Sequence, residues 1–355
     1  MLGQSSWALS SDNINAYLAE KGGHLGPVTF KLGDREIQPF HVAPWAEETG
    51  VEPPLLEVLR GDFFCMPFGD NAKAYGDEQH PPHGETANEK WKAVEGGWEL
   101  KSKIRPATIF KEIALRDTAI YQRHTVSGGS GPMNFGHHAM LAFPSEGLVS
   151  ASHFQFGMVF PGTFEEPARG GYSSLKPGER FSRLEIVPMA NGSVANLSRY
   201  PAREGFEDLV MLVGDDTLPF AWNAVVFPAE GYVWFSLRNP RVLRHTVLWH
   251  SNGGRHYAPW NGRHRRVLGI EDVTSYFHYG LAESASTNSL TEEGIPTSVD
   301  LSPDAPLVVS TIMGVAAVGP GAEHVDSIEA RRDGVDIVLA SGESVFAPVD
   351  LSFLD

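Results

Sequence analysis

Three short segments carry side chains that could transfer protons. His83 precedes a glycine, His137 and His138 follow an Asn-Phe-Gly run further along the chain, and Glu271 follows a short apolar run. Histidine titrates near neutral pH, and a carboxylate in a sheltered pocket can be tuned to act as its opposite number. These residue types are the parts needed to move protons on a small polar substrate, provided that the fold brings them together.

The local setting of each histidine limits where its ring can point. Prolines precede His83, so we expect an extended path there, with Gly84 allowing a close backbone approach. His137 and His138 are neighbours in a predicted strand and therefore point to opposite faces, so only one of them can face a given pocket. The alternatives are a surface-loop histidine at 83 and a partly exposed pair at a strand start.

Glu271 is predicted to end a buried strand, and Asp272 should point the other way. A carboxylate in such a place is costly unless it is hydrogen-bonded or useful. A structural carboxylate that caps a turn is the alternative interpretation.

A second cluster combines aromatic and polar side chains around Trp249, His250 and Arg255, with Trp260 nearby. Aromatic rings beside polar groups suit the apolar faces and hydroxyl edges of a sugar. The alternative is that Trp249 packs in the core and that Arg255 is a solvated loop residue. Further basic residues at 263–266 allow a phosphorylated sugar as the substrate, although a solvated basic loop is the favoured interpretation of this stretch.

Composition restricts the classes of partner. The chain has 355 residues and a net charge of −16, which argues against binding nucleic acid or an anionic membrane surface and fits a small-molecule substrate. The single cysteine, Cys65, lies in an apolar run and is predicted to be a buried small hydrophobe. Without disulfides, a signal-peptide pattern or an apolar run of about 18 residues, the chain is predicted to be cytoplasmic.

Period-two patterning predicts an all-β, antiparallel sandwich or barrel in a single domain over residues 1–355. The run 12–23 is compatible with one short helix or with a strand that enters a turn. Residues 283–304 are expected to form a long surface loop, with a lid beside the pocket as the alternative. The clearest predicted strands cover residues 27–32, 150–159, 231–237, 244–250, 307–312 and 334–339.

Metal and nucleophile motifs are weak. His80 and His83, with His137 or His138 and Glu271, are residue types that bind zinc or iron, but no tight ligand pair occurs on one element. The sequence also lacks a Gly-x-Ser-x-Gly elbow and a glycine-rich phosphate loop. We therefore predict no metal and no organic cofactor.

In this order, the segments resemble the aldose 1-epimerase (galactose mutarotase-like) superfamily. The family pattern His-Gly-x-Ala-Arg, often followed by Asn and Trp, is matched by His83, Gly84, Asn88 and Trp91, whereas Ala87 stands where the arginine is expected. The segment 60–69, which begins with Arg60, is similar to the apolar leader that precedes the family's first histidine.

The resemblance implies a β-supersandwich with a curved sugar-binding face and an isomerase that interconverts sugar anomers without a cofactor. The family's second histidine falls on His138 and its glutamate on Glu271. Ring opening needs a base for the anomeric hydroxyl and an acid for the ring oxygen, so Glu271 would be the base, His138 the acid, and His83 a hydrogen-bond donor to a sugar oxygen. The residues expected to contact the substrate are Arg60, Asn88, Trp91, His137, Trp249, His250 and Arg255.

Three other functions remain open from the sequence. A glycoside hydrolase or polysaccharide lyase on the same fold would need a second carboxylate, which Glu85 or Asp272 could supply. A carbohydrate-binding or sensing module without catalysis is supported by Ala87. A cupin-like metal protein would carry stoichiometric metal after purification.

Overall fold

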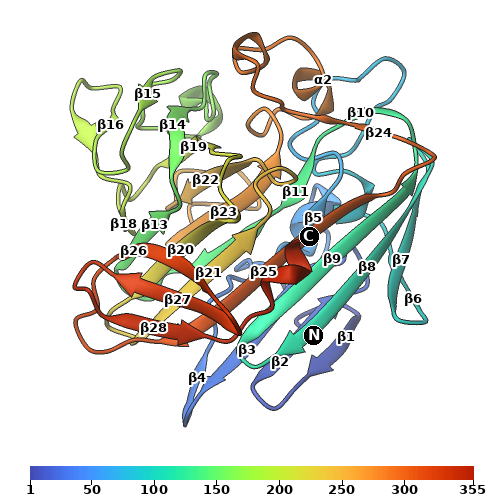
Figure 1. Cartoon of the computed structure of the whole chain (residues 1–355). Helices are drawn as coiled ribbons and strands as arrows, with labels where there is room; N and C mark the ends of the chain where they lie inside the picture. The colour runs from blue at the N-terminus through green and yellow to red at the C-terminus, as the bar shows by residue number, and fades with distance from the viewer.

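Antiparallel sheets dominate the computed structural model, which describes all 355 residues (Figure 1). Strand order in the larger, nine-stranded sheet is β18 (Arg199–Tyr200), β13 (Gly147–Ala151), β20 (Ala221–Phe227), β21 (Tyr232–Arg238), β25 (Leu307–Ala317), β9 (Ala119–Gly128), β8 (Ala107–Arg116), β7 (Gly97–Ser102) and β6 (Lys92–Val94). The predicted all-β antiparallel class is therefore confirmed.

The eight-stranded sheet carries the candidate site. Its order is β15 (Arg180–Phe181), β14 (Phe154–Val159), β19 (Glu207–Gly214), β22 (His245–Ser251), β23 (Val267–Thr274), β11 (Phe135–His137) and β5 (Phe64–Cys65), and β12 (Ala139–Ala142) also pairs with β23. Long β-branched and apolar runs explain why β19, β22 and β23 are buried on both faces.

Smaller sheets cover the edges and outer faces. The N-terminal sheet contains β1 (Ser6–Ser10), β2 (Ile14–Ala19), β3 (Leu25–Leu32) and β4 (Arg35–Ile37), and the C-terminal sheet contains β26 (Val325–Arg331), β27 (Gly334–Leu339) and β28 (Ser344–Ala347). Two-stranded sheets pair β10 (Gly131–Met133) with β24 (Val299–Leu301), and β16 (Val187–Pro188) with β17 (Val194–Ala195).

Helices are few and short. The α-helices are α1 (Pro54–Glu57) and α2 (Leu281–Ser284), and the 3₁₀ turns are η1 (Glu85–Ala87), η2 (Pro167–Arg169), η3 (Thr291–Glu293) and η4 (Leu351–Leu354). None of the helices has the length and hydropathy required to cross a bilayer.

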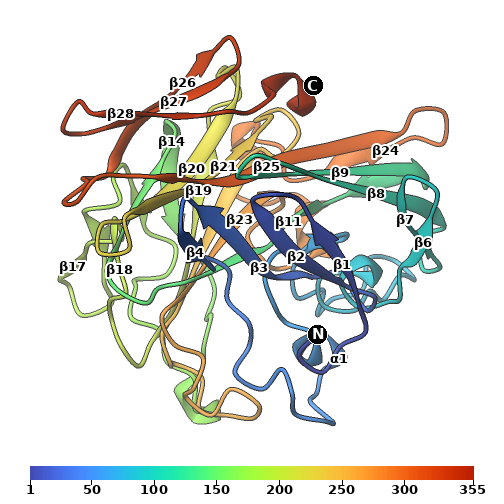
Figure 2. The ribbon, with the colours of Figure 1, turned by 90° about the horizontal axis from the view of Figure 1, so that it is seen from below.

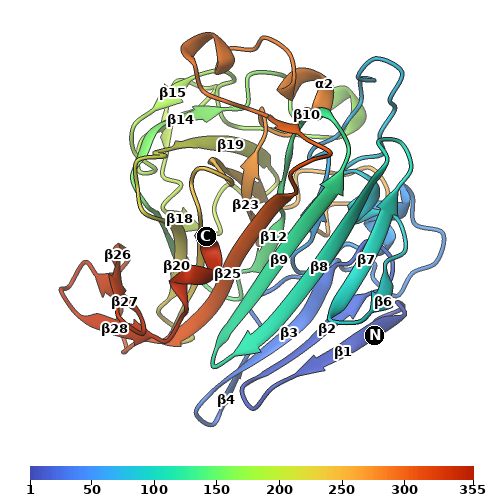
Figure 3. The ribbon, with the colours of Figure 1, turned by 45° about the vertical axis from the view of Figure 1, so that its right-hand side comes forward.

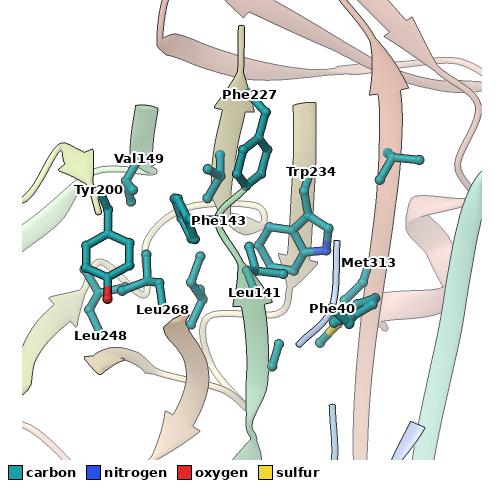
Figure 4. Close-up of a cluster of buried hydrophobic side chains, with 14 of the residues drawn as sticks. Phe40, Leu141, Phe143, Val149, Tyr200, Phe227, Trp234, Leu248, Leu268 and Met313 are labelled. Carbon is teal, nitrogen blue, oxygen red and sulfur yellow. The ribbon is translucent and has the colours of Figure 1, made fainter. Parts of the chain in front are cut away.

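The sheets are layered around a shared core. Side chains from the N-terminal, eight-stranded and nine-stranded sheets form one buried cluster, to which Phe30 belongs. Figure 4 shows part of this cluster, with Leu141, Trp234 and Leu268 labelled. Figure 2 shows the N-terminal sheet lying beneath the nine-stranded sheet, and Figure 3 shows β25, β9, β8, β7 and β6 side by side. The C-terminal sheet packs on the outer face of the nine-stranded sheet through a separate cluster.

The structure settles one open alternative and corrects one predicted strand. The ambiguous run 12–23 forms strand β2, with alternating burial, and not a helix. The predicted strand 150–159 is divided, because the chain leaves the nine-stranded sheet after β13 and joins the eight-stranded sheet at β14. The other predicted strands form with end shifts of a few residues.

Side-chain alternation along β19, β22 and β23 divides the residues between two environments. Leu248, Leu268 and Ile270 belong to the core between the large sheets. Leu209 and Trp249 belong to a second cluster on the opposite face of the eight-stranded sheet, where loops cover it. The candidate site lies on this loop-covered face.

Candidate functional site

A cavity of about 690 Å³ lies on the loop-covered face of the eight-stranded sheet. Its size is in the range of small-molecule sites. The side chains that line its sheet face and its polar walls include Phe63, Asp70, His83, His138, Phe160, Phe164, Glu165, Leu209, Trp249, Arg255, Tyr257, Trp260, Glu271, His278 and Tyr279. The sequence-predicted residues that it brings together are therefore His83, His138, Trp249, Arg255 and Glu271.

Glu271 and His138 face each other across neighbouring strands. β11 and β12 pair with β23 in one continuous register, with Gly136 opposite Val273 and Ala139 opposite Ile270, which places His138 opposite Glu271. The His138 Nε2 and Glu271 Oε1 atoms are 3.3 Å apart, and both side chains are almost fully buried. Glu271 lies inside β23, so the prediction that it ends a strand is wrong.

His83 reaches the same place from a loop. Its ring centroid is 5.0 Å from that of His138, in an edge-to-face arrangement. The prediction of an extended path is wrong at His83 itself, which has φ 58°. The close approach expected at Gly84 does occur, because a Cβ there would lie 1.9 Å from the Met66 carbonyl oxygen. The chain next to His83 is therefore packed directly against Met66, and His83 itself lines the cavity.

Phe63 supports the ring of His138 from behind. The two rings stack with centroids 4.6 Å apart, and His24 stacks on the other face of Phe63 at 4.0 Å. The His138 backbone N–H also donates to the Phe63 carbonyl at 2.9 Å. These contacts hold the plane of the His138 ring, and the Nε2 edge of the ring faces Glu271.

Burial sets the protonation of the three groups in the empty cavity. It raises the pKa of Glu271 well above its ordinary value, with only Arg255 opposing. It lowers the pKa of His138 to about 3, and it lowers that of His83 well below its ordinary value. Both imidazoles are therefore neutral near pH 7, and burial favours the protonated form of the Glu271 carboxyl.

Arg255 forms one wall together with Glu165. Its Nε donates to Glu165 Oε1 at 2.5 Å, and the Tyr257 hydroxyl donates to Glu165 Oε2 at 3.1 Å. The guanidinium carbon lies 4.5 Å from the Trp260 ring centroid and 5.2 Å from that of Trp249, a cation–π arrangement. The terminal amino groups of Arg255 make no hydrogen bond to the protein, so they are available to an oxygen in the cavity.

Aromatic side chains also line the cavity around Phe164, over which the Arg255 guanidinium lies at 5.4 Å. Phe160 lies between Phe164, at 5.7 Å, and Tyr279, at 4.6 Å, and His278 stacks on it at 5.8 Å. Asp70 lines this region without an ion-pair partner, and burial raises its pKa. Flat apolar surfaces beside isolated polar groups are suited to a pyranose ring.

Two predicted contact residues lie on the opposite faces of their strands. His137 Nδ1 is 2.8 Å from Asp62 Oδ2 in a fully buried pair. His250 is buried against Tyr200, with ring centroids 5.5 Å apart. Neither side chain lines the cavity, because alternation along β11 and β22 sends each ring into the core.

Three other predicted contact residues hold loops together outside the cavity. Arg60 is buried and donates to the carbonyls of residues 1, 2 and 58. Asn88 donates to the carbonyls of Pro82 and Gly84, each at 2.7 Å, and thereby braces the His83 loop. Trp91 donates to the Thr86 carbonyl at 2.9 Å and is buried. Arg60, Asn88 and Trp91 are absent from the cavity lining.

The two carboxylates considered as partners for a hydrolase are also engaged elsewhere. Glu85 accepts hydrogen bonds from the backbone N–H groups of Lys103 and Ile104. Asp272 forms a buried ion pair with Arg238 at 2.7 Å and accepts from Asn223. Glu85 and Asp272 do not line the cavity.

The basic stretch does not form a phosphate patch. Arg263 pairs with Glu48 and Arg265 pairs with Glu204, and both arginines lie outside the cavity lining. His264 is buried beneath Trp249. The structure contains no group of three or more His, Cys, Asp or Glu side chains arranged to hold a metal ion.

Several cavity residues have no recognisable sequence signal. Asp70, Glu165 and His278 come from loops with no motif, and only the folded chain places them beside β22 and β23. Of the predicted loop 283–304, only Glu283 lines the cavity. Ala87 is buried in η1 and does not line the cavity, although it belongs to the same buried cluster as Phe63 and Trp249.

No family model and no curated protein sequence matches the chain. Solved structures do. A protein of Escherichia coli K12, provisionally described as an aldose 1-epimerase, superposes with a TM-score of 0.61 at 12% identity, over 89% of this chain and 100% of that one. A galactose mutarotase-related enzyme of Lactobacillus acidophilus gives 0.57 at 13% identity, over 88% and 98% of the two chains.

A galactose mutarotase-like protein of Lactobacillus casei also matches, with a TM-score of 0.56 at 13% identity over 88% of this chain and 100% of that chain. Identities this low carry the fold and no residue roles. The order of sheets, the antiparallel pairing and these superpositions agree with the resemblance drawn from the sequence. The chain has the galactose mutarotase-like fold.

Proposed function

We propose that this protein is an aldose 1-epimerase-type enzyme that interconverts the anomers of a sugar bound in the cavity. The observation that supports this function is the buried pair of Glu271 and His138, whose side chains lie 3.3 Å apart on the cavity wall with His83 beside them. Aromatic walls and a guanidinium complete a site suited to a polyhydroxylated ring.

Glu271 and His138 would exchange one proton with the sugar at each step. Ring opening removes the proton of the anomeric hydroxyl and protonates the ring oxygen, and ring closure on the other face reverses both transfers. Each group therefore acts once as acid and once as base in every cycle. From the sequence we assigned Glu271 as the initial base, whereas burial favours the protonated carboxyl of Glu271 and the neutral imidazole of His138, a starting state in which His138 would be the initial base.

His83 would orient the sugar. The Gly69 backbone N–H approaches His83 Nδ1 at 3.5 Å, an arrangement that assigns the proton to Nε2 and lets Nε2 donate to a sugar oxygen. Arg255 would donate its free amino groups to hydroxyls from the opposite wall. Arg255 would thereby provide a guanidinium to the sugar, in a chain that has Ala87 where the family arginine is expected.

We expect an uncharged aldose rather than a phosphorylated one. The cavity is lined by the carboxyl groups of Asp70, Glu165, Glu166, Glu271 and Glu283, against the cations of Lys73, Arg169 and Arg255. Arg255 is already paired with Glu165, so the cavity has no cluster of unpaired positive charges that could bind a phosphate.

The test is one-dimensional NMR of freshly dissolved aldoses, which follows the ratio of α to β anomer with and without protein. We expect acceleration with a neutral aldose, and loss of that acceleration in Glu271→Gln and in His138→Ala. Saturation transfer to a sugar without any acceleration would contradict the enzyme and support a binding module. Neither acceleration nor transfer with neutral, acidic and phosphorylated aldoses would refute the proposed function.

A further inference from the structure

Glu207 is a fully buried carboxylate that lies directly behind the cavity. It is the first residue of β19 and stands opposite Ser251 of β22. It does not line the cavity, and no step of the proposed reaction uses it. A buried carboxylate without such a use is expected to have a structural partner that requires it.

Three donors converge on this carboxylate. Trp249 Nε1 donates to Oε2 at 3.0 Å, the Ser251 hydroxyl donates to Oε1 at 3.0 Å, and the Gly254 backbone N–H donates to Oε1 at 3.1 Å. An ionised carboxylate can accept all three bonds, whereas a protonated one must use one oxygen as a donor. The Ser251 hydroxyl also lies 2.6 Å from His264 Nδ1, so it donates to Glu207 when His264 carries its proton on Nδ1, and the ionised form of Glu207 then satisfies all three donors.

Two of the donors, Trp249 and Gly254, connect Glu207 to different parts of the cavity wall. Trp249 lies on the sheet face of the cavity. The ring of His264 stacks beneath it, with the ring centroids 5.3 Å apart and an interplanar angle of 12°. Gly254 immediately precedes Arg255, whose guanidinium lies over the Trp249 ring. One carboxylate thus fixes both the aromatic surface and the start of the arginine wall.

We propose that Glu207 is a positioning residue, which in its ionised form holds Trp249 and the backbone beside Arg255 in the orientation that a sugar requires. Only the sugar-binding readout given below rests on the proposed function. The orientation of the Trp249 indole can be measured without any sugar.

The surroundings of Glu207 bring the pKa of its carboxyl close to neutral pH, so the ionised fraction changes with pH in that range. Burial raises the pKa of the Glu207 carboxyl to about 7, while Arg255 and the donors from Ser251 and Trp249 act in the opposite direction. Glu165 adds to the rise. The titratable and charged groups that face it from the packed elements are Arg255, Glu165, Tyr200, Tyr257 and His264.

The experiment follows the indole N–H resonance of Trp249 in ¹⁵N-labelled full-length protein from about pH 5.5 to about pH 8.5, with the peak assigned through Trp249→Phe. We expect one titration with a midpoint near 7 in the wild type and none in Glu207→Gln. Glu204→Gln is the matched control, because Glu204 is an exposed carboxylate of the same segment, and it should keep the titration. A flat wild-type peak, or an unchanged titration in Glu207→Gln, would overturn the proposal. Where Glu207→Gln does not fold, Glu271→Gln tests the same assignment, because Glu271 also lines the cavity beside Trp249: the titration should persist in Glu271→Gln, and its loss there would overturn the proposal.

The sugar readout separates this inference from the proposed function. If only the ionised form binds, the dissociation constant of the aldose should rise about tenfold between about pH 8 and about pH 6 in the wild type, and it should be weak and constant in Glu207→Gln. An indole titration without binding of any sugar would support the positioning of Trp249 and contradict the proposed function. Binding that is equally tight at both pH values, together with a clear titration, would overturn the positioning role.

Discussion

Replacement of Glu271 by Gln separates the chemistry of the site from its stability. Burial raises the pKa of Glu271 well above its ordinary value, so the folded state favours the neutral acid form of the side chain. Gln is also neutral and has the same shape, and its amide can still pair with His138 Nε2, which lies 3.3 Å from Glu271 Oε1. The substitution removes the transferable proton while leaving the packing and the charge of the folded state nearly unchanged.

The expected magnitudes differ for the two properties. The free energy of unfolding should rise at neutral pH, because the wild-type carboxyl is ionised in the unfolded chain and has to take up a proton to fold, whereas Gln does not, and no cavity is formed. The anomerisation rate should fall about 10²–10⁴-fold, the usual contribution of one general acid–base group. Sugar affinity should stay within a few-fold, because the aromatic walls and Arg255 are intact.

Urea denaturation monitored by tryptophan fluorescence gives the first quantity, and NMR of anomer exchange with the same samples gives the second. His83→Asn is a useful comparison, because it alters a hydrogen-bond donor in the proposed role without removing the proton-exchanging pair, so its rate loss should be smaller. A Glu271→Gln protein that retains full activity would refute the assignment of Glu271. A loss of more than about 2 kcal/mol of stability would refute the argument that the wild-type carboxyl is neutral.

Three further predictions concern stability. Asp272→Asn should cost about 3–5 kcal/mol in urea denaturation, because it leaves the buried guanidinium of Arg238 without its counter-ion; little change would refute the ion pair. Gly84→Ala should destabilise by at least about 2 kcal/mol, since its Cβ would lie 1.9 Å from the Met66 carbonyl oxygen at φ +76°; a neutral result would contradict that contact. The pKa of Glu207 is raised from 4.5 to about 7, so its contribution to stability is present below about pH 4.5 and is lost as pH rises through 7, amounting to about 3 kcal/mol. Glu207→Gln should remove this pH dependence in denaturation curves, and identical profiles would refute it.

The strands could be predicted because their signal is local. Alternation and β-branched residues mark β3, β21, β22, β25 and β27 in the sequence, and the structure contains all five. The division between β13 and β14 could not be predicted in the same way. Its cause is the partner that each half finds, since β13 pairs with β20 and β14 with β19, in different sheets.

The residues nearest the proposed chemistry were within reach of sequence reasoning, and the cavity walls were not. His83, His138 and Glu271 each stand in a segment whose residue types are unusual for their surroundings. Glu165 has no such signal, because it becomes part of the site only through its bond to Arg255, which is ninety residues away in the chain. A contact of this kind depends on tertiary structure, which no local pattern records.

Side-chain alternation explains why neighbouring residues of the right chemical type divide between site and core. Along β23, Glu271 faces the cavity, and Asp272 faces the core, where it pairs with Arg238. Along β22, Trp249 faces the cavity and His250 packs against Tyr200. The same sequence signal, a polar or aromatic residue in an apolar run, therefore has two physical causes. In one, the side chain is held inside the core, by an ion pair for Asp272 and by ring packing for His250, and in the other the group keeps hydrogen-bonding capacity free for a ligand. Only the strand register decides between them, and in β23 that register is continuous from Gly136 to Ala139 on the partner strands.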